Sequence, residues 1–309
     1  MRIPIGLFGA VMGLAGLGLA ARLAATVWPG VFRAPAYFTE PWVALGLLAF
    51  VALSAAYLWK IFFHTKSVVE EFRNPVTLGM CGALPVAMSL VAGGIGPYAP
   101  GAARILWWAS FGVMLAFQIL GLARILSGGV ALEQLNGGWL ILLVGGIVLP
   151  GPGLSLGLEE GARFTFGVSA VAAVPLTALL FYRALFGPPL PEPLRPTWFI
   201  LLVPPSLIYA NGLALYPMAE FLETLYFFGL ALAAALLWAA RRVLRWQFGA
   251  PWWAFTFPLD ALAYAAARYA QDHPAPLWNA LSGATLVLAT LFVVLVLWRT
   301  LRNAASLRG

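Results

Sequence analysis

Ten long apolar stretches, almost free of charge, follow one another along this chain. They cover residues 4–27, 41–63, 75–94, 103–126, 137–157, 164–186, 197–215, 219–240, 252–271 and 276–299. A helix needs about 20 apolar residues to cross the hydrocarbon core of a bilayer. Barrel strands are shorter and alternate in polarity, whereas these stretches are continuously apolar. We therefore predict one all-α integral membrane domain over residues 1–309, with ten transmembrane helices.

The composition excludes a water-soluble enzyme, because too few polar side chains are available to cover its surface. Hydrophobic residues make up 62% of the chain and charged residues 9%, whereas about 25% of a soluble domain is charged. The net charge is +7, and the charged residues lie singly between the apolar stretches rather than on one face. No basic face for nucleic acid is therefore expected. The single cysteine, Cys81, excludes a disulfide framework and a thiolate metal cluster.

The basic residues predict the orientation of the chain in the membrane. With the amino terminus inside, 13 Lys and Arg fall on the cytoplasmic side and 5 on the other. Basic residues beside membrane helices favour the cytoplasmic side, so we expect both termini there. The cytoplasmic set is Arg2, Lys60, Lys66, Arg73, Arg124, Arg183, Arg195, Arg241, Arg242, Arg245, Arg299, Arg302 and Arg308, and the opposite set is Arg22, Arg33, Arg104, Arg163 and Arg268.

The ends of the stretches also fit membrane spans. The first stretch is too long for the hydrophobic region of a cleaved signal peptide, so we interpret it as a retained span. Tryptophans stand near several span ends, where aromatic belts form at the membrane surface. These are Trp28, Trp59, Trp139, Trp252, Trp253 and Trp298.

Proline is concentrated in the odd-numbered spans, and the kinks we expect are at Pro4, Pro85, Pro150, Pro204 and Pro258. An interior proline kinks a helix, which a membrane tolerates where neighbours or water re-satisfy the backbone. We therefore expect kinked odd-numbered helices in the centre and even-numbered helices around them. The spacing of 54 residues from Pro150 to Pro204, and again to Pro258, indicates five repeated helical hairpins. The alternative is that proline is simply common in membrane helices.

The residues needed by an ordinary enzyme are lacking. The chain has two histidines, His64 and His273, which is too few for a zinc site. The sequence Gly153-Leu-Ser155-Leu-Gly157 matches the elbow of serine hydrolases, but that motif requires a strand before it and a histidine in reach. We interpret it as a helix-breaking segment. We expect no catalytic residue, no metal and no cofactor.

Three short motifs occur in the first, third and ninth spans. They read Ile3-Pro4-x-Gly6-x-Phe8-Gly9, Asn74-Pro75-Val76 followed by Leu84-Pro85, and Trp252-Trp253-Ala254-Phe255-Thr256-Phe257-Pro258. Together with the ten spans, the chain resembles the tellurite-resistance and dicarboxylate transporter family. That family includes bacterial tellurite-resistance membrane proteins, yeast malate and sulfite transporters and plant slow anion channels. The resemblance covers nearly the whole chain, in order.

The resemblance implies a homotrimer of independent pores, each made of five kinked inner helices ringed by five outer ones. It also implies that a phenylalanine of the ninth span blocks the middle of the pore. By position this is Phe257, with Phe255 as the fallback, and core packing is the other interpretation of Phe257. The sequence lacks the long tails of plant members. This difference argues against opening controlled by phosphorylation and favours a bacterial origin.

Asp260 is the residue that fits an anion pathway least well. It follows Pro251 by nine residues, which places it about 14 Å along the helix and near the bilayer centre. An acid inside a membrane span is functional by default, and proton coupling is one role. The other role is a structural acid that is turned away from the pore and is either neutral or bonded to an Asn, Tyr or Arg of a neighbouring helix. Tyr209 and Asn211 in span seven lie at a suitable depth for that bond.

The function that these observations predict is a passive channel for small anions, such as chloride or nitrate, in the bacterial cytoplasmic membrane. The alternative on the same scaffold is a proton-coupled transporter of dicarboxylates or of oxyanions such as sulfite and tellurite. A structural or enzymatic membrane protein is the third possibility. The expected partners are the anions, the lipid bilayer and two further copies of the chain.

Overall fold

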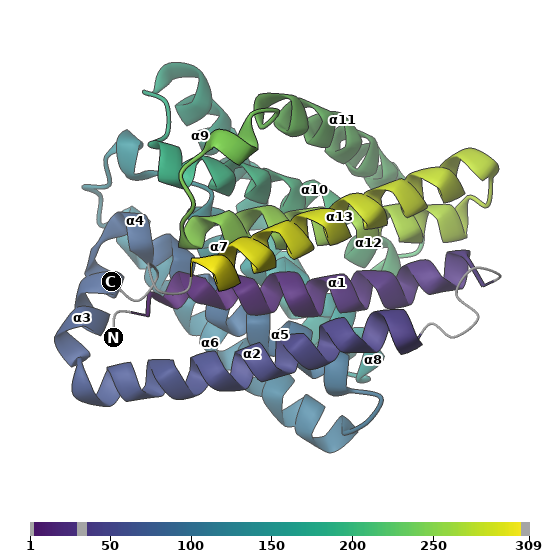
Figure 1. Cartoon of the computed structure of the whole chain (residues 1–309), viewed down its shortest axis with the longest axis horizontal. Coiled ribbons are helices and arrows are strands. Elements are labelled where there is room, and N and C mark those ends of the chain that lie inside the picture. Colours follow the sequence, from purple (N-terminus) through teal and green to yellow (C-terminus); the bar gives the residue numbers. More distant parts are fainter. Residues whose placement is uncertain (1–2, 30–35, 304–309) are drawn as a thin grey trace.

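The computed structural model describes residues 3–29 and 36–303, and it is helical throughout that part of the chain, with no strand among those residues (Figure 1). Nine helical segments there are long and apolar enough to cross a membrane. They are Ile5–Val27, Tyr37–Phe63, Pro75–Ile95, Pro100–Leu126, Gly138–Ser155, Glu159–Phe186, Glu192–Leu215, Glu220–Ala239 and Pro276–Arg302. The protein is therefore a multi-pass membrane protein.

The predicted ninth span, 252–271, is not among these nine segments. It consists of a 3-10 helix, η8 (Ala250–Phe255), and a 17-residue helix, α12 (Thr256–Asp272). The polar side chains of Thr256, Asp260 and Arg268 make this helix less apolar than the others. Almost every residue of α12 is buried by other helices, so its surface does not have to match lipid.

The odd-numbered segments are the buried ones, as expected from their prolines. In the four odd-numbered segments that are apolar enough to span a membrane, 67–83% of the most apolar stretch is buried inside the protein, against 17–33% in the five even-numbered segments. The even-numbered segments contain one long helix each. These are α2 (Ala36–Phe63), α6 (Pro100–Leu126), α9 (Glu159–Phe186), α11 (Glu223–Ala239) and α13 (Pro276–Arg302).

Each odd-numbered segment combines a 3-10 helix with α-helix. In chain order the pieces are η1 (Ile5–Leu7) and α1 (Phe8–Val27); α4 (Pro75–Leu78), η2 (Gly79–Gly82) and α5 (Ala83–Ile95); α7 (Gly138–Val144), η4 (Gly145–Val148) and α8 (Pro150–Ser155); η5 (Glu192–Leu202) and α10 (Val203–Leu215); and η8 and α12. Pro85, Pro150, Pro204 and Pro258 all lie in the first turn of the α-helix that follows the break. Proline is tolerated there because that N–H has no partner within the helix.

The buried elements contact one another in a closed circuit. Helix α1 packs against α5 and α12, α5 packs against η4 and α8, η4 packs against α10, and α10 packs against α12. Each long outer helix packs against this circuit, and Figure 1 shows α13, α1 and α2 side by side.

Side chains from neighbouring helices bond the backbone around the break at η4. Gln118 of α6 donates to the carbonyl of Leu143 (2.9 Å), and Trp107 of α6 donates to that of Leu149 (3.0 Å). Asn211 of α10 donates to the carbonyl of Ile147 (2.8 Å). Carbonyl groups inside a membrane protein require such partners, so these side chains stabilise the interruption of the helix.

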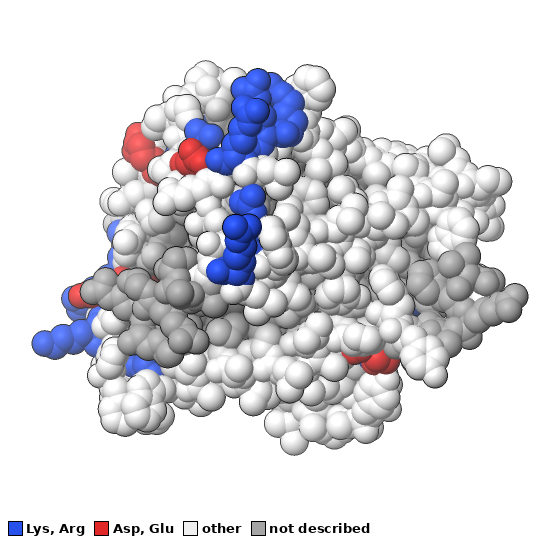
Figure 2. All heavy atoms as spheres, in the orientation of Figure 1, with Lys and Arg blue, Asp and Glu red and all other residues white. Residues whose placement is uncertain are grey.

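The charged side chains are unevenly distributed along the long axis. On the face shown in Figure 2, Lys and Arg side chains gather toward the end at which Figure 1 marks N and C. Lys60 donates to the carbonyl of Ile3 (2.9 Å), which places the end of α2 beside the start of the described chain. Three residues of the charge prediction, Arg2, Arg33 and Arg308, lie outside the described residues.

Two details of the sequence interpretation are wrong. Trp139, Trp252 and Trp253 do not form an aromatic belt, because their side chains are packed inside the protein. Only the exposed members of that set, such as Trp59 and Trp298, face the surroundings as a belt requires. Helix α2 begins at Ala36 rather than at residue 41.

Candidate functional site

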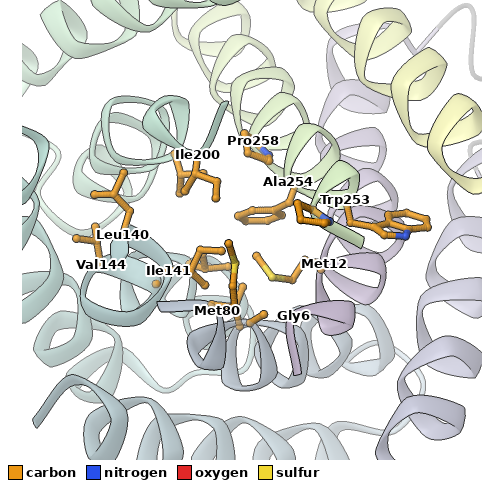
Figure 3. A pocket seen from close by; sticks show the side chains of 18 of the residues that line it. Gly6, Met12, Met80, Leu140, Ile141, Val144, Ile200, Trp253, Ala254 and Pro258 are labelled. Atoms are coloured by element: carbon orange, nitrogen blue, oxygen red, sulfur yellow. The ribbon is translucent and has the colours of Figure 1, made fainter. Parts of the chain in front are cut away.

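Two cavities lie inside the circuit of buried elements. The inner cavity, of about 40 Å³, lies toward the end of the molecule where α1 begins, and Figure 3 shows its apolar walls. The outer cavity, of about 460 Å³, lies toward the end of α1. Every residue that lines either cavity belongs to an odd-numbered segment or to the turn directly after one.

Two residues, Phe257 and Val148, line both cavities and therefore lie between them. Phe257 is 5% exposed and stands in the first turn of α12. Its ring lies against the backbone of Gly16 in α1, since a methyl group at Gly16 would come within 2.9 Å of Phe257 Cδ2. A side chain at position 16 would therefore displace the ring or the helix that carries it.

The fallback residue, Phe255, lies in a different environment. Its side chain is completely buried and lines neither cavity. Its ring centroid is 4.8 Å from that of Phe199 and 5.5 Å from that of Phe292. Phe255 therefore packs between η5 and the outer helix α13.

The proposed kinks contribute unequally to the cavity walls. Pro204 and Pro258 line the inner cavity, together with Met12 and Met80 (Figure 3). Pro85 and Pro150 line neither cavity, but they stand at the breaks in their segments. Pro4 directly precedes η1.

Polar side chains are confined to the outer cavity. Its walls include Arg22, Ser155, Asn211, Asp260 and Tyr264, whereas the residues that line the inner cavity are apolar apart from their backbone. Among the described residues that line the two cavities, the charged ones are Arg22 and Asp260. An ion in the outer cavity would therefore meet one cation and one acid.

Arg22 is held in place by a network near the end of α1. Its guanidinium forms an ion pair with Glu40 of α2 (2.6 Å) and donates to the carbonyl of Gly94 (2.9 Å). The acid neutralises much of its charge, and the carbonyl fixes its position. The sequence interpretation counted Arg22 only among the basic residues of the non-cytoplasmic side and did not identify its place in the cavity wall.

Asp260 has no hydrogen-bond partner among the described residues, although it is 1% exposed. Neither of the two possible partners, Tyr209 and Asn211, forms a hydrogen bond with it in this structure. The amide of Asn211 donates to Ile147, and Tyr209 is stacked against Tyr226 with a centroid distance of 5.5 Å. Asp260 Oδ2 would lie 3.0 Å from a methyl group at Gly16, so the carboxyl group and the Phe257 ring flank the same glycine.

The residues of the hydrolase-like motif serve to end a helix. Ser155 is the last residue of α8, and its hydroxyl donates to the carbonyl of Pro152 (2.7 Å). Gly157 follows with a φ of +72°, a conformation that suits glycine at a helix end. A hydrolase motif would need a histidine beside the serine, but the Nε2 atom of His273 lies 2.8 Å from Glu223 Oε1.

One part of the site that sequence reasoning missed is the glycine face of α1. Gly13 and Gly16 lie against Thr256 and Phe257 of α12, with no room for a methyl group at either. The spacing of Gly9, Gly13 and Gly16 on one helical face was the available signal for close helix packing.

Comparison with known proteins gives matches over most of the chain. A family model described as voltage-dependent anion channel matches residues 2–301. The S-type anion channel SLAH2 of Arabidopsis thaliana is 26% identical over 98% of this chain and 60% of its own length. The guard cell S-type anion channel SLAC1 of the same plant is 24% identical over 98% of this chain and 56% of its own. An uncharacterized transporter of Methanocaldococcus jannaschii is 27% identical over 63% of this chain and 65% of its own. The chain thus spans about three-fifths of the length of these relatives.

Proposed function

The chain belongs to the voltage-dependent anion channel family, and on that premise we propose that it is a passive channel for small anions such as chloride and nitrate. The family match confirms the resemblance to the transporters and slow anion channels. The observation that carries the proposal is that Phe257 separates two cavities whose walls come from all five odd-numbered segments.

The fold of the channel would be a ring of five helical hairpins. In this arrangement η8 and α12 make the tenth crossing, because they close the circuit between α10 and α1. The outer helices α2, α6, α9, α11 and α13 shield the broken inner segments from lipid. Open backbone at the breaks is acceptable at membrane depth only where protein or a water-filled cavity surrounds it.

Conduction through this ring would depend on the dehydration of the anion. The inner cavity is narrow and apolar, so an anion entering it loses water that no fixed cation replaces. The ring of Phe257 then closes the path to the outer cavity. Hydrophobic constrictions of this kind close a pore by excluding water. Weak binding along the walls fits modest selectivity among small anions.

The assembly and the location complete the proposal. We expect a homotrimer of independent pores in the bacterial cytoplasmic membrane, with both termini in the cytoplasm. The bias of basic residues toward one end supports this orientation. Light scattering of the purified protein in detergent measures the number of copies.

A proton-coupled transporter of dicarboxylates or oxyanions is the second candidate, and Asp260 favours it. This carboxyl group lines the outer cavity beside Phe257 and has no protein partner in the described chain. Ionised, it would repel an anion, and protonated, it would let one pass. Such an acid can tie the movement of a proton to that of the substrate.

Current recording across a planar bilayer separates the two candidates. The purified protein is placed between two chloride solutions of unequal concentration at equal pH. A channel gives unitary currents that reverse near the chloride equilibrium potential. A carrier gives no unitary current, and a pH gradient drives its anion flux. A folded protein with neither current nor flux would refute both.

A further inference from the structure

A third hollow lies outside the circuit of buried elements. It has a volume of about 520 Å³, and four arginines and two tryptophans provide its large side chains, Arg183, Arg195, Arg241, Arg242, Trp198 and Trp246. We call it the arginine pocket. Its residues come from the end of α9 and the turn after it, from η5, and from the end of α11 and the segment after it. Arg299 of α13 donates to the carbonyl of Leu244 (3.0 Å), which places this segment beside the end of α13.

The positive charge of the pocket is not balanced by an acidic partner among the residues that the structure describes. Within the described residues, none of the four pocket arginines forms an ion pair with a carboxylate. Glu192, three residues before Arg195, accepts a hydrogen bond from the backbone N–H of Gln247 (2.7 Å) and does not line the pocket. Four guanidinium groups around one hollow repel one another unless an anion lies between them.

Two of these arginines are positioned by contacts that leave their charge available. Arg183 is 1% exposed, and it donates to the carbonyls of Leu135 (2.8 Å) and Pro188 (2.7 Å). The Arg195 guanidinium lies over the ring of Trp246, 5.8 Å from its centroid. Carbonyl and ring contacts orient a guanidinium without cancelling its charge. The planar, preorganised arginine fork matches phosphate oxygens well.

The surface next to the pocket is apolar and faces the surroundings. Leu185 and Phe186 of α9 and Trp238 of α11 are each about 70% exposed. Both α9 and α11 pack against α10, so these two outer helices flank the same inner helix. The helix ends place the pocket at the boundary of the spans. A ligand with an anionic head and apolar tails would therefore meet suitable surfaces for both parts.

We propose that the arginine pocket binds the phosphate headgroup of an anionic phospholipid, with its acyl chains against α9 and α11. Basic pockets between membrane helices on the cytoplasmic side bind anionic lipid headgroups by this combination of charge and position. The lipid phosphate would neutralise the positive charge of the pocket. Its acyl chains would connect the outer helices α9 and α11. This site is independent of the ion path, so it stands whether the protein is a channel or a carrier.

The test is a lipid titration of the full chain in neutral detergent, followed by native mass spectrometry. Phosphatidylglycerol is compared with phosphatidylcholine, and then with glycerol 3-phosphate and inorganic phosphate, which lack acyl chains. The test variant is Arg195→Gln/Arg242→Gln, which leaves the hydrogen bonds of Arg183 intact. The control is Arg245→Gln/Arg302→Gln, because these arginines do not line the pocket.

We expect the parent protein to prefer phosphatidylglycerol, and the test variant to bind it about 30-fold more weakly, which is about 2 kcal/mol. The control variant should stay within about threefold of the parent, since the arginines that it removes do not line the pocket. Equal binding of the two lipids by the parent protein overturns the proposal, even if the variant does not fold. Equal losses in test and control variants overturn it as well. Displacement of the lipid by glycerol 3-phosphate or inorganic phosphate at comparable concentration would make this a free phosphate site instead.

Discussion

Under the proposed function, truncation of Phe257 to alanine is expected to open a path between the two cavities. The ring borders the inner cavity on one side and the outer cavity on the other. Removing it leaves a methyl group between the two cavities, while Gly16 and Val148 remain in place. An anion could then keep more of its water while it passes this point, which lowers the barrier to conduction.

The size of the effect follows from the hydration that the anion keeps. Leaving one polar partner unsatisfied in an apolar site costs about 1–3 kcal/mol. Each 1.36 kcal/mol of barrier is about tenfold in rate. Keeping a single additional water partner should therefore raise the conductance by about 5- to 160-fold. The loss of stability should stay below the about 3–5 kcal/mol of a Phe to Ala change in a filled core, because the ring already borders open space.

Planar bilayer recording measures the current, and thermal unfolding in detergent measures the stability. Phe255→Ala and Phe8→Ala are matched controls, because both rings are fully buried and line neither cavity. We expect these controls to lower the unfolding temperature without any gain in current. Equal currents from all three variants, or no increase from a folded Phe257→Ala protein, would refute the role of Phe257.

Three other changes test separate parts of the account. Asp260→Asn should abolish any increase of anion flux on acidification, since an amide side chain takes up no proton in this range; flux in the parent that does not vary with pH rules this out. Gln118→Leu should lower stability by about 1–3 kcal/mol in thermal unfolding, because the carbonyl of Leu143 loses its donor, whereas Ile119→Leu on the exposed face should be neutral. A reporter fused after Gly309 should be active only in the cytoplasm, and activity on the other side would overturn the orientation.

Much of the architecture could be predicted from the pattern of apolar residues and prolines. Apolar length predicts spans, and proline marks helices that need protein neighbours, so the alternation of buried and exposed segments follows from the sequence. Helix α12 is an informative exception. Its residues looked like an ordinary span, but the helix is less apolar because protein rather than lipid surrounds it.

The contacts of individual side chains could not be predicted in the same way. Depth along a helix suggested Tyr209 and Asn211 as partners of Asp260, yet the rotation of α10 turns Asn211 toward Ile147. Rotation depends on packing between helices, and sequence spacing alone does not define it. The arginine pocket was missed for a related reason, because its residues come from three segments that only the fold brings together.

Cysteine accessibility tests most directly whether the two cavities form one path closed by Phe257. In a Cys81→Ser background, Ser155→Cys places a thiol in the outer cavity and Ala254→Cys places one in the inner cavity. A charged thiol reagent is added to one side of sealed membranes, and the rate of modification is measured. With Phe257 present, each thiol should react from its own side only, and with Phe257→Ala both should react from either side. Modification of both thiols from one side in the presence of Phe257, or no crossing in the folded Phe257→Ala protein, would contradict the account.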